Sequence, residues 1–209
     1  VNPLMGTEST FEFSHGNTYP AVAVPWGVNF WTPQTGENRS GWIYAYTDEE
    51  IRGFRQTHQP SPWINDYGTF SVMPISGDLK VSYKDRGVRF SHKNEIARPD
   101  YYKVQFDNGT VTELSASRTK QNRRVTGYTR NNCGGVPSNF ANYFVLEFSH
   151  PIKDQGIQIN DDLFPGKLVG EHDRVCAYLQ FDVPEGEKLT VRVASSFIGE
   201  EQAWLNFDR

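Results

Sequence analysis

The sequence is poor in cysteine and contains no long apolar run. Its two cysteines, Cys133 and Cys176, lack the C-x-x-C spacing of a zinc site. They can pair in an oxidising compartment or lie unpaired as small buried hydrophobes, and the sequence leaves both possibilities open. No apolar run approaches the roughly 18 residues of a membrane span. No run of lysine or arginine is long enough to follow a phosphate backbone, and the net charge is −4, so we expect no nucleic-acid partner.

Common catalytic and metal-binding signatures are also missing. The sequence has no G-x-S-x-G elbow, no H-E-x-x-H pair and no phosphate-binding G-x-x-x-x-G-K-[ST] loop. The five histidines are scattered, without metal-ligand spacing: His15, His58, His92, His150 and His172. The sequence therefore predicts no metal site within these residues.

The chain is a globular, aromatic-rich one. Hydrophobic residues make up 37% of its 209 residues and aromatic residues 14%, a composition that folds rather than remaining disordered. We find no internal repeat and no clean linker, so a single domain over residues 1–209 is the simplest interpretation. The chain begins VNPLMGTEST, without an initiator methionine, and we expect a targeting segment to have been removed.

From residue 69 onward, short strands dominate the pattern. Tyr102, Val104 and Phe106 alternate with polar residues, and Asp107-Asn108-Gly109 then predicts a hairpin turn. Three further candidate strands place apolar residues two apart: Phe144, Leu146 and Phe148; Val175, Ala177, Leu179 and Phe181; Leu189, Val191 and Val193. This spacing indicates an all-β, antiparallel β-sandwich with few or no long helices. A helix-like pattern occurs only in GEEQAWLNFDR, which we expect to be too short for a useful amphipathic face.

The first 68 residues are loop-like, with aromatic and polar side chains together. FRQTHQPSPWINDYG (residues 54–68) has the period of neither helix nor strand. Long irregular segments in compact domains are usually functional or disordered, and the aromatic content argues against disorder. Trp63 can stack on a sugar ring, while Asp66, His58 and Arg55 can bind its hydroxyls. Equally, Trp63 can plug one end of a sandwich and Asp66 can cap a turn, so composition alone decides neither way.

Five blocks resemble the N-terminal region of the glycoside hydrolase family 92 α-mannosidases. Two short ones are similar to the family patterns VNPFIGT and GHTFPGAxxPFG, and the loop above is similar to GFSHTHxSGxGxxDYG. The remaining two are similar to FSHxxExAxPGYYxVxL…ITAELTAT and ISFVSxEQAxxNL. In order along the chain the blocks read VNPLMGT, HGNTYPAVAVPWG, GFRQTHQPSPWINDYGTFSVMP, FSHKNEIARPDYYKVQFDNGTVTELSAS and SSFIGEEQAWLNFDR. Residues 119–174 lie outside this resemblance.

The resemblance implies an N-terminal β-sandwich of the galactose-mutarotase-like type, packed on a C-terminal (α/α)6 barrel with the active site between the two domains. Residues 197–209 would begin the connector to that barrel. The family members are calcium-dependent, inverting exo-mannosidases. The resemblance therefore implies hydrolysis of terminal α-linked mannose, with α-1,2 linkage favoured, and an enzyme whose fragment 1–209 is inactive alone.

The implied site residues come from the matched blocks. Trp63 and Asp66 are first, with His58 and Arg55 just upstream; His15, Asn17 and Thr18 in the HGNTYP block are second. Many members have GHTFP there, so His15 is displaced and Asn17 takes the usual histidine position. That block can equally be a structural meander. Glu95 is expected to make structural hydrogen bonds. No catalytic residue is implied in this fragment, because the family's acid and base come from the barrel.

Calcium is implied by the resemblance, with ligands expected mainly outside these residues, since Asp161-Asp162 is an isolated acidic pair. The implied partners are mannose-containing glycans and the C-terminal domain of the same protein, and the implied location is secreted or periplasmic. Two other classes stay open: a non-catalytic carbohydrate-binding or interaction sandwich, and a structural sandwich without a ligand.

Overall fold

The computed structural model describes residues 1–25, 27, 29–36, 43–59, 66–115, 124–131 and 135–208. Within them the helical segments are two 3-10 helices and one α-helix: η1 (Phe11–Asn17), η2 (Tyr83–Arg86) and α1 (Glu200–Asp208). The strands are β1 (Phe30–Gln34), β2 (Glu50–Ile51), β3 (Gly53–Thr57), β4 (Ser71–Val72), β5 (Val88–Arg98), β6 (Tyr101–Phe106), β7 (Val111–Ser115), β8 (Arg124–Thr129), β9 (Asn142–Phe148), β10 (Ile152–Ile159), β11 (Asp162–Pro165), β12 (Val175–Phe181) and β13 (Val191–Ser196).

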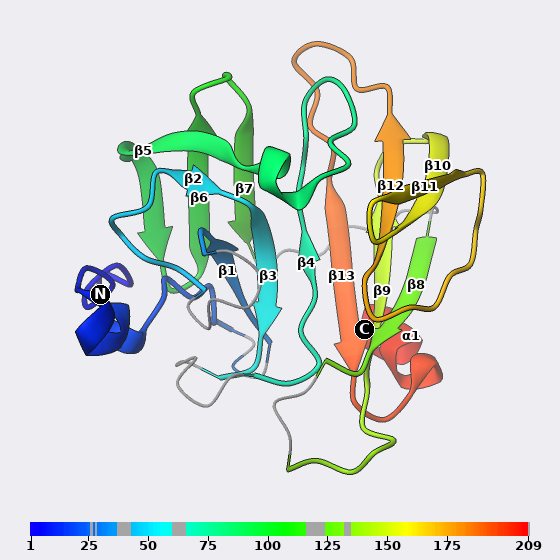
Figure 1. The fold of residues 1–209 in the computed structure, drawn as a ribbon, viewed down its shortest axis with the longest axis horizontal. Helices are drawn as coiled ribbons and strands as arrows, with labels where there is room; N and C mark the ends of the chain where they lie inside the picture. The colour runs from blue at the N-terminus through cyan, green and yellow to red at the C-terminus, as the bar shows by residue number, and fades with distance from the viewer. Residues whose placement is uncertain are drawn as a thin grey trace. The chain divides into compact units, whose positions relative to one another are not determined.

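The strands form four sheets in the described residues, in the orders β1-β3-β4, β2-β5-β6-β7, β11-β10-β12 and β13-β9-β8 (Figure 1). Every recorded strand pairing is antiparallel. The predicted all-β antiparallel fold is confirmed. The chain divides into two compact units: residues 1–79, 86–117 and 129–141 form the first, and residues 80–85, 118–128 and 142–209 form the second.

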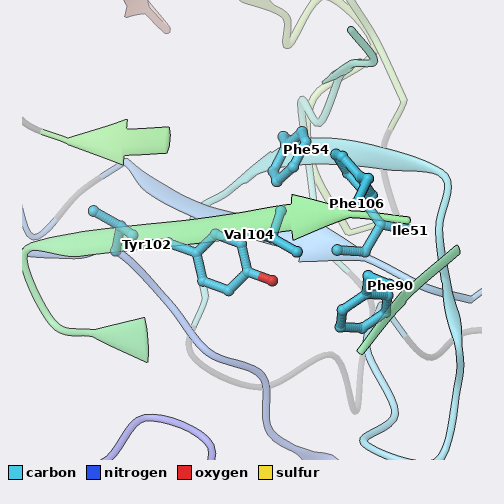
Figure 2. Packing of buried hydrophobic residues seen from close by; sticks show 7 residues of the cluster. Ile51, Phe54, Phe90, Tyr102, Val104 and Phe106 are labelled. Carbon is cyan, nitrogen blue, oxygen red and sulfur yellow. The ribbon is translucent and has the colours of Figure 1, made fainter. Parts of the chain in front are cut away.

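The first unit is a sandwich with a hydrophobic core between its strands. Side chains of β2, β3, β5 and β6 meet there (Figure 2), and the buried members are Val22, Ile51, Phe54, Phe90, Tyr102, Val104 and Phe106. The alternation predicted for β6 is confirmed, because Tyr102 and Val104 are fully buried while Gln105 is exposed. The hairpin to β7 is confirmed too: Gly109 has φ +86°, and its N–H donates to Phe106 O at 2.9 Å.

Three strands of this unit, β1, β2 and β3, lie inside the first 68 residues, which look loop-like in sequence. FRQT belongs to β3, the central strand between β1 and β4. Four of the five residues of β3 are buried, and the buried ones include Gln56 and Thr57. The loop interpretation is wrong for this strand because its buried positions carry polar side chains, which hide the strand pattern.

The second unit contains α1, which packs on β9 and β13. Ala203 and Phe207, four residues apart on α1, are buried against Val145. The expectation that this helix is too short for a useful apolar face is therefore wrong. The helix covers the face of β9 that carries Val145, which is opposite to the face predicted to be apolar. Val145 is fully buried there, and so is Glu147, two residues further along the strand.

The predicted strand over residues 175–181 forms as β12, but its predicted apolar face is only partly correct. Leu179 and Phe181 are half-buried, whereas Val175 and Ala177 are exposed. Cys176 lies half-buried between them, and its Sγ donates to Ala177 O at 3.4 Å. Cys133 lies outside the described residues, so both possibilities for the two cysteines, paired or unpaired, stay predictions.

Candidate functional site

The FRQTHQPSPWINDYG segment begins within β3. Strand β3 carries Arg55 and ends at Thr57, His58 follows directly, and Asp66 lies eight residues further on. Residues 60–65, including Trp63, lie outside the described residues. The structure therefore describes the two ends of this segment, residues 54–59 and 66–68. The role of Trp63 stays a prediction.

Asp66 joins the two ends of that segment. Its Oδ2 accepts the backbone N–H of His58 at 2.7 Å, and its Oδ1 accepts that of Tyr67 at 2.7 Å. The Asp66 side chain is 4% exposed, and the His58 side chain, whose Nδ1 lies 3.6 Å from Asp66 Oδ1, is 2% exposed. A carboxylate that accepts buried N–H groups removes the cost of leaving them without a partner. Asp66 thus has a structural role, whatever else it binds.

Aromatic rings pack against each other at the two ends of this segment. The His58 ring lies parallel to the Tyr67 ring, with centroids 5.7 Å apart and an interplanar angle of 8°. Tyr67 in turn packs edge-on against Phe140, with centroids 5.5 Å apart. Aromatic pairs in these arrangements add to the energy of burial and fix ring orientation. His58 is therefore held rigidly next to Asp66.

Arg55 has more N–H donors than the one recorded acceptor uses. Its Nη2 donates to Thr69 Oγ1 at 2.8 Å, and Asn131 Nδ2 donates to the same oxygen at 3.3 Å. Burial lowers the pKa of Arg55, and the nearby Asp66 carboxylate opposes that shift. Thr69 is the one hydrogen-bond partner of the guanidinium recorded within the described residues. A guanidinium has five N–H donors, so Arg55 can bind further oxygen atoms.

Tyr19, which the sequence analysis did not single out, links this segment to the HGNTYP block. Its hydroxyl donates to Thr57 Oγ1 at 3.0 Å, across 38 residues of sequence. Burial raises the pKa of Tyr19 to about 12; the Thr57 hydrogen bond opposes this, and the Asp66 carboxylate adds to it. Tyr19 also packs with Ile43 and Tyr44 in a second buried cluster. The resemblance pointed to both blocks, but only the fold brings them together.

The HGNTYP block begins in a turn of unusual backbone conformation. Ser14, His15, Gly16 and Asn17 all have positive φ, at 56°, 48°, 78° and 53°. A left-handed conformation costs a non-glycine residue roughly 1–2 kcal/mol, so surrounding contacts must hold this turn. Gly16 fits because a Cβ there would lie 1.6 Å from Gly6 O. Such strain persists where other contacts over-determine it, which is often at a functional site.

The predicted residues of this turn differ in surroundings. His15 lines a cavity of about 670 Å³, and its ring meets Phe11 edge-on, with centroids 6.2 Å apart. Asn17 Oδ1 is buried and accepts no hydrogen bond from the residues that the structure describes. Thr18 ends the turn in an extended conformation. No recorded hydrogen bond joins Asn17 or Thr18 to Asp66 within the described chain.

Residues 45–50 form one wall of the cavity that His15 lines. Ala45, Thr47 and Asp48 line it, together with two ion pairs, Glu49 to Arg89 and Glu50 to Arg52, the latter at 2.9 Å. Asp48 makes no ion pair with any described residue. The wall thus offers hydroxyl, carboxylate and guanidinium groups to a ligand.

The buried carboxylate of Glu95 holds side chains that neighbour this wall. Glu95, whose side chain is fully buried, accepts the hydroxyls of Tyr102 at 2.6 Å and Tyr44 at 3.2 Å, and lies 2.7 Å from His92 Nδ1. His92 Nε2 donates to Tyr46 O, and the two rings stack at 3.8 Å. Burial, followed by the Glu95 charge, raises the pKa of both Tyr44 and Tyr102. These contacts agree with the structural role expected for Glu95.

No three His, Cys, Asp or Glu side chains among the described residues are grouped so that they could hold a metal ion. The acidic wall of the cavity does not change this, because Glu49 and Glu50 are each paired with an arginine. The calcium implied by the resemblance stays a prediction, with its ligands expected mainly outside these residues. None of the helices in the described residues is long and apolar enough to cross a membrane.

Fold and site together define an all-β sandwich domain with a buried polar cluster, formed by Asp66 and His58 at the end of β3. The profile of the glycosyl hydrolase family 92 N-terminal domain matches residues 1–120 and 117–196. An inverting mannosidase of family GH92 from Bacteroides thetaiotaomicron VPI-5482 is 57% identical, with a TM-score of 0.93, and the match covers 100% of this chain and 32% of that chain.

A GH92 alpha-mannosidase from Bacteroides thetaiotaomicron has the same fold, with a TM-score of 0.76 at 22% identity over 100% of this chain and 34% of that chain. No curated protein matches the sequence. The chain belongs to glycosyl hydrolase family 92, as its N-terminal domain. It spans about a third of the length of these solved relatives.

Proposed function

We propose that this chain is the N-terminal domain of an inverting exo-α-mannosidase that releases terminal α-linked mannose from glycans, with α-1,2 linkage preferred. The observation that carries the proposal is the 57% identity over the whole chain to an inverting mannosidase of the family. Because the match covers 32% of that relative, the reaction would require a further domain of the same polypeptide.

The domain would supply substrate-binding loops and not the catalytic acid or base. Inversion needs two carboxyl groups about 6.5–9.5 Å apart, with room for a water molecule between them. The two buried carboxylates of the matched blocks are engaged otherwise, Asp66 with two backbone N–H groups and Glu95 with two tyrosines and a histidine. This engagement supports an acid and a base contributed by the rest of the polypeptide.

Within the proposed site, Trp63 stacks on the sugar and Arg55 donates to its hydroxyls. Arg55 suits this role because it is half-buried and has N–H donors beyond the one given to Thr69. Asp66 and His58 hold the segment that carries Trp63, or a hydroxyl group beside it. The remaining proposed binding residues are His15, Asn17 and Thr18 of the left-handed turn.

Calcium dependence and a secreted or periplasmic location belong to the same proposal. No group of three His, Cys, Asp or Glu side chains that could hold a metal occurs among the described residues, so the ligands would come mainly from the rest of the polypeptide.

The test is an assay of the intact gene product on α-1,2-, α-1,3- and α-1,6-mannobiose, with and without a calcium chelator. We expect turnover that is fastest on the α-1,2 isomer and lost with the chelator, and none from residues 1–209 alone. Binding of mannobiose without turnover by the intact protein would favour a carbohydrate-binding module instead. Trp63→Ala in the intact enzyme should lose most activity, and near-normal kinetics would exclude the assigned stacking role.

A further inference from the structure

We propose that Thr69 is a positioning residue of the mannose site and that, together with Asn131, it holds the Arg55 guanidinium in the orientation that binds substrate. This role rests on the proposed function, because it requires Arg55 to bind the sugar. It also gives a function to residues 129–131, which lie outside the sequence resemblance. Neither the sequence analysis nor the comparisons assign a role to Thr69 or Asn131.

The sheet places Thr69 beside Arg55. Arg55 of β3 pairs with Ser71 of β4, and the N–H of the next residue, Gln56, donates to Phe70 O at 2.9 Å. In an antiparallel pair, a residue and the one two positions before its partner lie on the same face, within reach of a long side chain. Thr69 occupies that diagonal position, and its Oγ1 accepts a hydrogen bond from Arg55 Nη2 at 2.8 Å.

The Thr69 oxygen is a fixed acceptor. Thr69 is 5% exposed, and a β-branched side chain has few accessible χ1 conformations. Asn131 Nδ2 donates to the same oxygen at 3.3 Å, so both acceptor positions of the hydroxyl are used. The hydroxyl therefore cannot turn away from Arg55 without losing a second hydrogen bond.

Further hydrogen bonds fix Asn131 at this position. Its backbone O accepts the N–H of Gly68 at 2.8 Å, and its own N–H donates to Thr129 Oγ1 at 3.2 Å. Thr129 Oγ1 donates in turn to Thr69 O at 3.4 Å, across 60 residues of sequence. An arginine side chain loses much rotamer freedom when it binds a ligand, and an acceptor fixed beforehand reduces that loss on binding.

Stability alone does not account for the surroundings of Arg55. The side chain is half-buried, and no ion pair of it is recorded among the described residues, because the nearby Asp66 carboxylate accepts two backbone N–H groups instead. Burial of a charge is costly unless an opposite charge pairs with it, and a neutral hydroxyl is a weaker partner than a carboxylate. A guanidinium in this arrangement, with N–H donors beyond the one that Thr69 accepts, is suited to a ligand.

The test is a mutant cycle in the intact gene product, with α-1,2-mannobiose as substrate. Thr69→Val keeps the shape of the side chain and removes its oxygen. We expect it to lower kcat/KM about tenfold, because a guanidinium without its acceptor is misplaced. Thr69→Ser keeps the oxygen and should stay within about twofold of wild type.

The second half of the cycle removes the arginine. Asn131→Ala, at an exposed residue, should lower kcat/KM about threefold, because it weakens the support of Thr69 and leaves the acceptor in place. In an Arg55→Ala background, neither Thr69→Val nor Asn131→Ala should lower kcat/KM by more than about twofold, since both act through Arg55.

The matched controls are Thr112→Val and Asn94→Ala. Thr112 Oγ1 is buried and has no hydrogen-bond partner among the described residues, and Asn94 is exposed. Both variants should keep the wild-type kcat/KM. Melting temperatures show which variants fold, and if Thr69→Val does not fold, Asn131→Ala decides the cycle.

Two outcomes would overturn the positioning role and leave the proposed function intact. One is an unchanged kcat/KM in Thr69→Val. The other is an equally large loss in the Arg55→Ala background, which would show that Thr69 acts through the fold and not through Arg55. An Arg55→Ala enzyme with wild-type kcat/KM would remove Arg55 from the site, and the positioning role with it. A wild-type protein that does not hydrolyse the disaccharide would instead overturn the proposed function, and this role with it.

Discussion

The hydroxyl of Tyr19 donates a hydrogen bond of 3.0 Å to Thr57 Oγ1, and this contact joins the two sequence blocks that carry the proposed binding residues. Tyr19 directly follows Asn17 and Thr18, and Thr57 directly precedes His58. Both partners are buried, Tyr19 at 4% exposure and Thr57 at 0%. A break in this contact would therefore be felt on both sides of the site.

Removal of either partner should destabilise the domain. We expect Tyr19→Phe and Thr57→Val each to lower the free energy of unfolding of the 209-residue chain by about 1 kcal/mol, because each leaves one buried hydroxyl without its partner. The double variant should lose less than the sum, which urea unfolding of all four proteins measures. Tyr83→Phe, at a half-exposed tyrosine, is the control and should change little. Strictly additive losses would contradict the contact.

Alkaline pH should weaken the same region. The pKa of Tyr19 is raised to about 12 in the folded state, so its burial contributes stability fully below the unfolded value near 10. That contribution is lost as pH rises through about 12. Ultraviolet absorbance of phenolate should show late-ionising tyrosines, and Tyr19→Phe should remove one that ionises near pH 12. If the absorbance lost in the variant belongs to a tyrosine that ionises near the ordinary value of about 10, the assignment is refuted.

Asp66 should be more important for stability than an ordinary surface carboxylate. Asp66→Asn keeps one acceptor for the two N–H groups, whereas Asp66→Ala keeps none. We expect losses of about 1 and about 2 kcal/mol in the free energy of unfolding, in that order. Asp173→Asn and Asp173→Ala, at an exposed carboxylate, provide the comparison. If Asp66→Ala unfolds at the wild-type urea concentration, its two backbone contacts contribute no stability.

Two glycines with positive φ should respond differently to alanine. Gly77 has φ +88° and open space around a Cβ, so Gly77→Ala should cost about 1 kcal/mol from backbone conformation alone. Gly16 has φ +78° and a Cβ there would lie 1.6 Å from Gly6 O. Gly16→Ala should therefore cost at least about 2 kcal/mol more than Gly77→Ala. Equal melting temperatures for the two variants would show that the turn is not held against Gly6.

The sequence predicted the fold best where apolar residues alternate. Tyr102, Val104 and Phe106 lie as expected, because one face of β6 meets the core and the other does not. The prediction failed at β3, whose buried positions include Gln56 and Thr57. Periodicity of hydrophobic residues carries no information on a strand whose polar side chains are satisfied inside the protein.

The site was predicted in part. The resemblance drew attention to Asp66 and His58, which the structure brings together, but it gave no sign of Tyr19 as the link between blocks. A contact across 38 residues depends on tertiary packing, which a single sequence does not encode in any local pattern. A tyrosine next to a proline within a matched block was the one available signal.

The stereochemistry of the first product tests the central claim most directly. The intact gene product would be given α-1,2-mannobiose in an NMR tube, and the anomeric signal of the released mannose followed from the first minutes. An inverting exo-α-mannosidase releases β-mannose first, with the α anomer appearing later by mutarotation. That order is what the account predicts. Release of α-mannose first, or no release at all, would contradict it.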